Sequence, residues 1–320
     1  MPPSTTDAAV AAHHPMTELE RLAAALDAGA ASGGVPVLAT LVSAVGSSFR
    51  RPGARLIVMP DGSLAGAISG GCLEKDLAAH AEAVRHAGAV KVVDYDLTSD
   101  DGPWGLGMGC AAQLRVVLEP CPAGAPGWMR DALRRLRVSE ELAVVEVGAF
   151  GTAPARGSAE ALLVDRIVSP PYVVACGDGP DADCLAKLAE LTGWLATLVR
   201  KDEPLPEATG SHLAVVLMTH NYERDRGLLE RIIGSGTRAG YVGLLGPRTR
   251  TDRLLADLAA AGIAADAAAR ERLHAPVGLD IGAESPEEVA LAIVAEIRAA
   301  FSARPGGRLR ERRGPIHGRP

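Results

Sequence analysis

The first third of the chain alternates between apolar runs and short polar turns, a pattern that is typical of a domain mixing strands with helices. A capping box from Thr17 to Glu20 predicts an alanine-rich helix that continues to about residue 29. A second helix is predicted over 73–87, ending near Gly88. Apolar runs bounded by turn residues predict strands at 35–42, 55–59, 63–68, 90–95 and 113–119, with Pro60-Asp61-Gly62 forming a hairpin turn.

The second half of the chain has a different order, in which strands and helices take turns. A strand from Tyr172, a glycine-rich turn, a helix over 181–192 and a strand over 194–199 follow one another. A further strand at 213–218 and a short one at Tyr241 come next, and Ser285 to Glu288 is a capping box that opens a helix over 286–300. Alternation of this kind is typical of parallel sheets covered by helices.

These patterns predict an α/β protein with two domains, which fits a length of 320 residues. We expect an N-terminal α/β domain with glycine-rich loops at 16–120 and a C-terminal, Rossmann-like parallel-sheet domain at 171–302. The segment 121–170, with a helix near 127–137 and a weak strand near 142–148, reads as a connector. The expected tails are 1–15, disordered, and 303–320, basic and disordered.

Composition narrows the class of protein. The formal net charge of −6 argues against a nucleic-acid-binding protein. No secretory signal is recognisable, and glycines and a proline interrupt the longest uncharged stretch, 28–49, so no membrane span is expected. The five cysteines lack a CxxC spacing, which favours reduced thiols in a soluble cytoplasmic protein; they are Cys72, Cys110, Cys121, Cys176 and Cys184.

Two glycine-rich loops in the N-terminal domain each carry a thiol. The first contributes the cations Arg50, Arg51 and Arg55, whose guanidinium forks suit phosphate or carboxylate. It continues through Ser69, Gly70 and Gly71 to Cys72, at the start of a predicted helix, where a thiol pKa is lowered. The second loop spans 100–110 and ends on Cys110. The alternative is that both thiols only fill space in a core.

The C-terminal domain contains the loop Gly177-x-Gly179-x-x-Ala182 between a strand and a helix, as in dinucleotide-binding units. The acidic residue that usually ends the second strand is replaced by Arg200, which disfavours NAD and tolerates the additional phosphate of NADP. Asp178 and Asp181 place negative charge in the loop itself, where they would repel a pyrophosphate. Binding of NAD(P) is therefore possible but disfavoured.

Two further segments follow predicted parallel strands, whose carboxyl ends border the ligand crevice in such folds. Thr219 and His220 follow one strand, and the histidine could titrate near neutral pH or bind a metal. Gly246 and Arg248 follow another, where a helix start could hold an anion. The alternatives are a surface or helix-capping histidine and a surface arginine.

Taken together, these motifs resemble the XdhC/CoxI family, accessory proteins that mature molybdenum-cofactor hydroxylases such as xanthine dehydrogenase. The matching segments run over 37–119 and 172–299, and they include the turn at Ser69-Gly-Gly-Cys72, the loop ending on Cys110, Thr219-His220 and the stretch from Tyr241 to Gly246. The sequence departs from the family pattern at Ala111, Ala112 and Pro247.

The resemblance implies a non-catalytic chaperone that binds molybdenum cofactor (molybdopterin) as cargo in the cytoplasm. Such a protein would protect the cofactor during sulfuration with a cysteine desulfurase and deliver it to a xanthine dehydrogenase or CO dehydrogenase-type hydroxylase. It further implies a homodimer. On this reading the candidate molybdenum contacts are Cys72 and Cys110, and no catalytic residues are assigned. The alternatives from the residues are an NADP-dependent oxidoreductase and a protein-interaction module.

Overall fold

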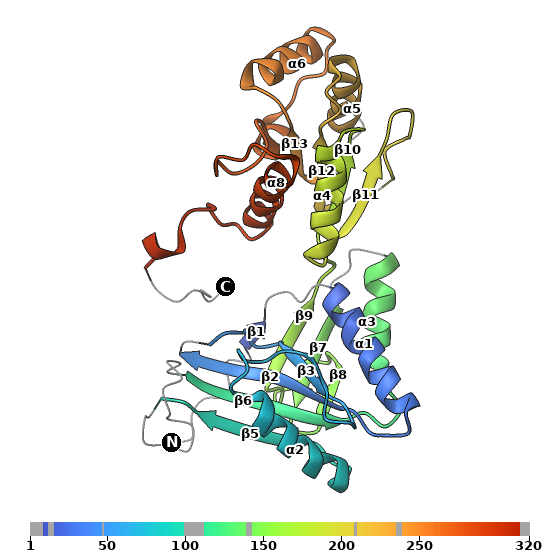
Figure 1. Cartoon of the computed structure of the whole chain (residues 1–320), viewed down its shortest axis with the longest axis vertical. Coiled ribbons are helices and arrows are strands. Elements are labelled where there is room, and N and C mark those ends of the chain that lie inside the picture. The colour runs from blue at the N-terminus through green and yellow to red at the C-terminus, as the bar shows by residue number, and fades with distance from the viewer. Residues whose placement is uncertain are drawn as a thin grey trace. The chain divides into compact units, whose positions relative to one another are not determined.

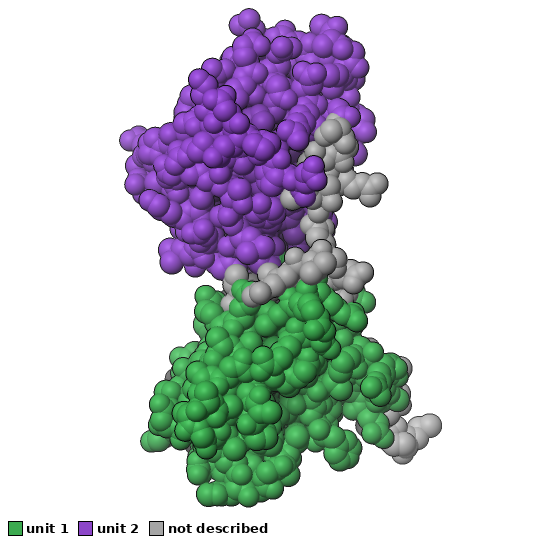
Figure 2. Space-filling view, turned by 90° about the vertical axis from the view of Figure 1, so that its right-hand side faces the viewer, with its two compact units in different colours: residues 1–169, 314–320 green, residues 170–313 purple. Residues whose placement is uncertain are grey.

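The computed structural model describes residues 9–11, 16–46, 48–98, 112–138, 143–207, 210–234 and 239–313. The chain divides into two compact units (Figure 2): unit 1 contains the residues up to Ser169 together with Gly314–Pro320, and unit 2 is Pro170–Arg313. Cys110 and the rest of the second glycine-rich loop lie outside the described residues. No helix in the described ranges is long and apolar enough to cross a membrane.

Unit 1 is built around an antiparallel sheet with the strand order β4-β3-β2-β6-β5 (Figure 1). Its strands are β2 (Val37–Gly46), β3 (Arg55–Val58), β4 (Leu64–Gly66), β5 (Lys91–Asp96) and β6 (Ala112–Pro120). Pairing of β3 with β4 confirms the predicted hairpin. The predicted helix α2 (Glu74–Ala87) is also confirmed, and it ends at Gly88, whose φ of 62° is the left-handed conformation that glycine favours.

The two faces of this sheet are covered by different layers. Because successive strand residues point to opposite faces, Ala39 and Leu41 pack beneath α2, whereas Leu38 packs on the other side. That second side is covered by α1 (Met16–Ala31) and α3 (Gly127–Val138), and by a small sheet with the order β1-β9-β7-β8. The unit is therefore layered around one central sheet.

Residues 121–170, expected to form a connector, instead belong to this second layer. They form α3, β7 (Ala143–Gly148), β8 (Gly151–Pro154) and β9 (Leu163–Ile167). The strands are short and the segment is rich in alanine, glycine and proline, so its apolar alternation is weak. Val145, Val147, Leu163 and Ile167 are nevertheless buried. In the expected N-terminal tail, β1 (Ala9–Ala11) pairs parallel to β9.

Unit 2 is a fully parallel five-stranded sheet with the order β11-β10-β12-β13-β14. The strands are β10 (Tyr172–Cys176), β11 (Leu195–Val199), β12 (Gly210–Leu217), β13 (Ala239–Leu244) and β14 (Leu273–His274). The helices are α4 (Pro180–Leu191), α5 (Tyr222–Gly234), α6 (Arg248–Ala260), α7 (Ala267–Glu271) and α8 (Pro286–Phe301). This architecture confirms the predicted Rossmann-like parallel sheet.

Both faces of the parallel sheet are buried, which explains the nearly continuous apolar strands. Val173 and Ala175 point to the face covered by α4 and α8, and Val174 and Cys176 point to the face covered by α5 and α6. Ser285 accepts a hydrogen bond from the backbone N–H of Glu288, whose side chain bonds back, so the predicted capping box of α8 is confirmed. Beyond α8, Leu309–Glu311 forms a short 3-10 helix within the expected basic tail.

Candidate functional site

The topology of unit 2 singles out one edge of its sheet. Strands β10 and β12 are neighbours, but the chain leaves β10 toward β11 on one side and leaves β12 toward β13 on the other. In open parallel sheets, ligands bind outside the carboxyl ends of the strands at such a switch point. The loops at this point begin at Gly177 after β10 and at Met218 after β12, and they contain most of the predicted C-terminal site residues.

The two glycines of the predicted phosphate loop serve different purposes. A Cβ atom added to Gly177 would lie 2.6 Å from the Met218 carbonyl oxygen and 3.1 Å from the Ala182 Cβ, so glycine allows the two loops to pack together. Gly179 precedes α4 without any side-chain cap, and a Cβ there would approach only His220, at 3.9 Å. Gly179 is therefore the glycine that leaves space beside the helix N-terminus.

His220 pairs with an acid of the same loop. Its Nε2 lies 3.1 Å from Oδ2 of Asp181, in the first turn of α4, and the imidazole is 62% exposed. His220 also adopts a φ of 55°, a left-handed conformation that is uncommon for a residue other than glycine. Asp181 thus orients the ring through Nε2, and Nδ1 has no hydrogen-bond partner among the described residues.

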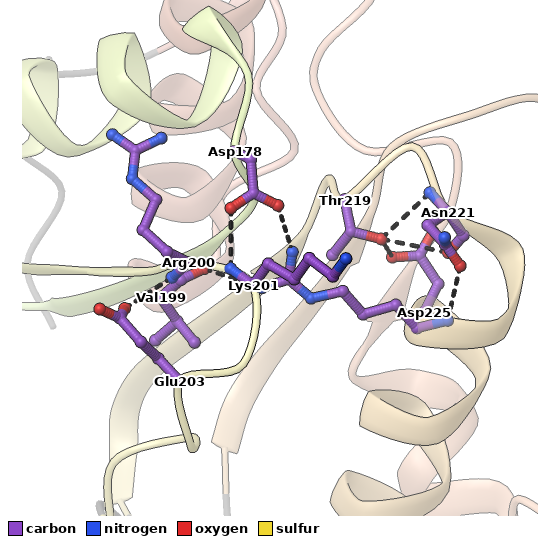
Figure 3. A network of polar contacts seen from close by, with 9 residues as sticks. Asp178, Val199, Arg200, Lys201, Glu203, Thr219, Asn221 and Asp225 are labelled. Carbon is purple, nitrogen blue, oxygen red and sulfur yellow. Dashed lines mark hydrogen bonds and ion pairs between the residues drawn. The ribbon is translucent and has the colours of Figure 1, made fainter.

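Asp178 is held by a polar network that Figure 3 shows at close range. Its carboxylate accepts hydrogen bonds from the backbone N–H of Lys201 at 2.7 Å and from Nη1 of Arg224 at 2.5 Å. Arg224 also donates to the Val199 carbonyl at 3.3 Å. The bond from Lys201, and then the guanidinium of Arg224, lower the pKa of Asp178. An ionised carboxylate consequently ties the glycine loop to the end of β11.

This network bears on the NADP hypothesis. A dinucleotide places its ribose at the end of the second strand of the unit, which is where Asp178 contacts Lys201. Arg200, whose charge motivated the hypothesis, donates to Asp183 at 2.7 Å, and its backbone N–H donates to Glu203. The arginine is thus engaged by a carboxylate of the chain itself, and the geometry does not favour binding of NAD(P).

Thr219 is engaged in a second network. Its hydroxyl donates to Oδ1 of Asp225 at 2.6 Å, and Arg250 donates to Oδ2 of the same carboxylate, which is fully buried. These contacts join the β12 loop to α5 and α6. Gly246, with a φ of 134°, allows the side chain of Arg250 to pass, because an added Cβ would lie 3.1 Å from its Cδ. Thr219 and Gly246 therefore support the edge rather than face a ligand.

Sequence reasoning did not select Asp225, Arg224 or Arg250 as site residues. Asp225 lies in the first turn of α5, and an acid there could have been assigned to the helix dipole alone. Arg248, which was selected, begins α6, is exposed and has no carboxylate within 4 Å in the described part of the chain. It lines a cavity together with Arg270, a residue for which the sequence held no local signal.

In unit 1, the predicted thiol turn is an open surface feature. Gly70 and Gly71 are exposed, with no atom of the described residues within 4 Å of an added Cβ apart from their chain neighbours, and Gly71 has a φ of 110°. Cys72 is half-buried and packs partly against the core beneath α2. The turn therefore presents the exposed backbone of two glycines beside a half-buried thiol.

The turn that leads into α2, by contrast, is held by hydrogen bonds within the chain. Ser69 donates to Glu74 and accepts bonds from the backbone N–H groups of Gly71 at 3.2 Å and Leu73 at 3.1 Å. Burial opposes ionisation of Glu74, but the bonds from Ser69 and the backbone outweigh it and lower the pKa of this carboxyl. A carboxylate from the first turn of α2 thus ties down the turn that precedes the helix.

Among the predicted arginines of unit 1, Arg50 and Arg55 contact acids. Arg50 contacts Glu18 at 2.7 Å. Arg55 is only 1% exposed, contacts Asp165 at 2.7 Å and places its guanidinium over the ring of Trp128. The expectation that Arg55 binds a soluble ligand is not supported, because its charge lies inside the unit. Arg51 is half-buried. No group of three His, Cys, Asp or Glu side chains in the described residues is arranged to hold a metal ion.

Comparisons with known proteins match both units. The XdhC Rossmann domain family matches residues 173–297, and the XdhC and CoxI family matches residues 30–96. Among solved structures, a xanthine dehydrogenase from Bacillus halodurans is 26% identical, with a TM-score of 0.72, over 91% of this chain and 97% of that one.

Two curated relatives match over most of their length. The chain is 30% identical over 313 residues to a probable xanthine dehydrogenase subunit of Bacillus subtilis, covering 82% of this chain and 92% of that protein. It is 26% identical over 278 residues to the molybdenum cofactor insertion chaperone PaoD of Escherichia coli, covering 83% of each. The family matches in both units, together with the 30% identity over most of the Bacillus subtilis relative, show that the chain belongs to the XdhC and CoxI family.

Proposed function

We propose that this protein binds molybdenum cofactor and supports maturation of a xanthine dehydrogenase-type molybdenum hydroxylase. The observation that carries the proposal is the similarity, along 83% of each chain, to a molybdenum cofactor insertion chaperone. Similarity to a probable xanthine dehydrogenase subunit from Bacillus subtilis supports the same class of client enzyme. The role is that of a carrier, and no side chain is assigned to catalysis.

The chemistry of unit 1 fits this cargo at the thiol turn. Molybdenum and transferred sulfur favour soft thiolate ligands, and Cys72 offers a thiol at a turn whose glycines admit a close backbone approach. Gly70 and Gly71 would let peptide groups contact the polar edges of a pterin. Cys110, outside the described residues, is proposed as the second thiol. Arg55 has a structural role instead.

In unit 2, the residues that remain available to a ligand are Gly179, His220 and Arg248. Gly179 leaves the N-terminus of α4 uncovered, and His220 presents Nδ1 beside it. The cofactor brings a terminal phosphate, for which an arginine is the natural partner. Gly177, Thr219 and Gly246 hold the loops in place.

The test is anaerobic purification from a host that makes the cofactor, followed by quantification of pterin and molybdenum by mass spectrometry. Wild type should carry cofactor, and Cys72→Ser and Cys110→Ser should each carry less. Cys184→Ser, which alters a half-buried thiol on α4, is the matched control and should retain the wild-type amount. Equal cofactor in all three variants would remove the role of the thiols.

Protein that carries no pterin from such a host would contradict the proposal and favour a protein-interaction module. We also propose the finer steps. The protein protects the cofactor in the cytoplasm while a cysteine desulfurase provides sulfur, and it delivers the cofactor to the hydroxylase as a homodimer. Incubation of cofactor-loaded protein with apo-hydroxylase should restore hydroxylase activity only when the sulfuration step has preceded it. Light scattering should give twice the chain mass.

A further inference from the structure

A cavity of about 230 Å³ lies in unit 2 between α6 and the segment formed by α7 and β14. Its polar lining consists of Arg248, Thr251, Asp252 and Arg270, and Leu255 and Leu273 supply apolar wall. None of the contacts that hold the switch point uses these side chains.

The cavity belongs to the edge of the sheet where ligands bind. Strand β14 runs parallel to β13, with Gly243 opposite His274, so Ala275 on the cavity wall lies beyond the last paired residue of β14. Helix α6 begins at Arg248, four residues after β13 ends (Figure 1). Ala275 and the start of α6 therefore lie beyond the carboxyl ends of β14 and β13, whereas Arg270 comes from α7, before β14.

The arginines of this cavity differ from the others at the candidate sites. Arg50, Arg55, Arg200, Arg224 and Arg250 each contact a carboxylate of the chain. Within the described ranges, neither Arg248 nor Arg270 has a carboxylate within 4 Å, and the Nε of Arg270 donates to the Ala265 carbonyl at 3.1 Å. Two uncompensated guanidinium groups thus line one small space.

Thr251 adds a hydroxyl to the lining. The residue is only 5% exposed and lines the cavity, and its hydroxyl has no hydrogen-bond partner in the part of the chain that the structure describes. The hydroxyl is not among the fully buried polar atoms, so it can donate a hydrogen bond to a ligand in the cavity or accept one from it.

We propose that this cavity binds the phosphate of a small phosphate monoester. Two guanidinium forks and one hydroxyl match the three terminal oxygens of a phosphate better than the two of a carboxylate. Asp252 reduces the favourable charge but leaves a net positive cavity. Leu255 and Leu273 contact the organic part of the ligand. The inference rests on the proposed function and deepens it, because Arg248 is also the arginine proposed for the terminal phosphate of the cofactor.

The experiment measures binding of phenyl phosphate to the full-length chain by calorimetry at low ionic strength, with benzoate as the carboxylate of equal ring size. Arg248→Ala and Arg270→Ala should each weaken phenyl phosphate binding by roughly 3- to 10-fold. Asp252→Asn should tighten it by roughly 2- to 5-fold, because it removes a repulsive charge. Arg226→Ala, which removes an equal charge from α5 outside the cavity, should leave the Kd unchanged.

Thr251→Val separates a binding role from a structural one. It removes the hydroxyl at nearly constant shape, so it should weaken phenyl phosphate binding while leaving the melting temperature equal or higher. The proposal is overturned if phenyl phosphate does not bind, if both arginine variants bind it as wild type does, or if benzoate binds as tightly. Because the probe is not the cofactor, these results are separate from those of the cofactor purification.

Discussion

Arg55 and Asp165 form an ion pair with both side chains inside unit 1, at 1% and 0% exposure. Arg55 lies on β3 and Asp165 on β9, so the pair joins the central sheet to the small sheet. The guanidinium also lies over the ring of Trp128, with its Cζ 5.0 Å from the ring centroid. Two desolvated charges of this kind are tolerated only because each has the other as its partner.

Removing one partner should therefore be costly. Asp165→Asn removes the ion-pair partner of the buried guanidinium, and we expect a loss of about 3 kcal/mol in the free energy of unfolding. The measurement is urea unfolding, with the slope m as a check on the two-state assumption. Arg134→Ala, which breaks an exposed pair with Asp131, should change stability by less than about 1 kcal/mol. Equal effects from the two variants would contradict this account of the buried pair.

The thiols differ in reactivity for a similar reason. Burial raises the pKa of Cys121 and of Cys176 to about 12, whereas the thiol of Cys72 is half-exposed on an open turn. Because only the thiolate is nucleophilic, iodoacetamide at about pH 8 should modify Cys72 well before Cys121 or Cys176. Peptide mass spectrometry over time measures each site separately. Simultaneous modification of all three in folded protein would show that the buried thiols are accessible.

At the residue scale, the roles of glycines were easier to predict from the sequence than the roles of charged side chains. Gly71 adopts a φ of 110° and Gly177 lies in a close approach, both of which their lack of a Cβ explains, and such needs are local. The partner of an arginine is not local: Arg55 meets Asp165 from 110 positions away. A cluster of arginines therefore predicts neither a free cation nor an anion site. Arg248 and Arg270 could be distinguished from the rest only in the folded chain.

At the scale of elements, the start of α2 shows how a turn is fixed without a ligand. Ser69 and Glu74 together accept hydrogen bonds from the backbone N–H groups of Ser69, Gly71 and Leu73, in the turn before the helix. The lowered pKa of Glu74 means that the folded state favours the ionised carboxylate. Its contribution to stability is therefore present above the unfolded value, near 4.5, and is lost as the pH falls through the lower folded pKa.

Two substitutions test the hydrogen bonds that Ser69 and Glu74 make in this turn. Ser69→Ala removes an acceptor for two amides and should lower the free energy of unfolding by about 1 kcal/mol at about pH 7. Glu74→Gln should also destabilise the protein at neutral pH, and its difference from wild type should shrink as the pH is lowered below the folded pKa of Glu74. Thermal unfolding followed from about pH 3 to about pH 7, a range that brackets the ordinary glutamate pKa, provides the measurement. A difference that grew at low pH would exclude an ionised Glu74 as the stabilising group.

Elements with strong periodicity or capping signals were predictable, and weakly patterned ones were not. The capping box at Ser285 and the stop at Gly88 are local, and both helices are where the sequence places them. Strands β7 to β9 are short and rich in small residues, so their burial depends on the neighbouring layers that α1, α3 and β2 provide. Tertiary contacts, not propensity, create that part of the fold.

At the scale of the whole molecule, the buried apolar residues separate by unit. The clusters around α2, beneath α1 and α3, and between the two sheets contain only residues of unit 1. The two clusters that flank the parallel sheet contain only residues of unit 2. Because cooperative unfolding follows the extent of a shared core, two such units are expected to unfold as two cooperative blocks.

Calorimetry of two variants with matched core substitutions can assign each unfolding transition to one of the two units. Leu118 and Leu185 are both fully buried, one in the sheet of unit 1 and one on α4 of unit 2, and truncation of such a leucine costs about 2–5 kcal/mol. Leu118→Ala should lower the melting temperature of one transition, and Leu185→Ala that of the other. If both substitutions shifted a single transition together, the cores would be thermodynamically coupled, and ligand binding in unit 2 would then also stabilise the thiol turn of unit 1.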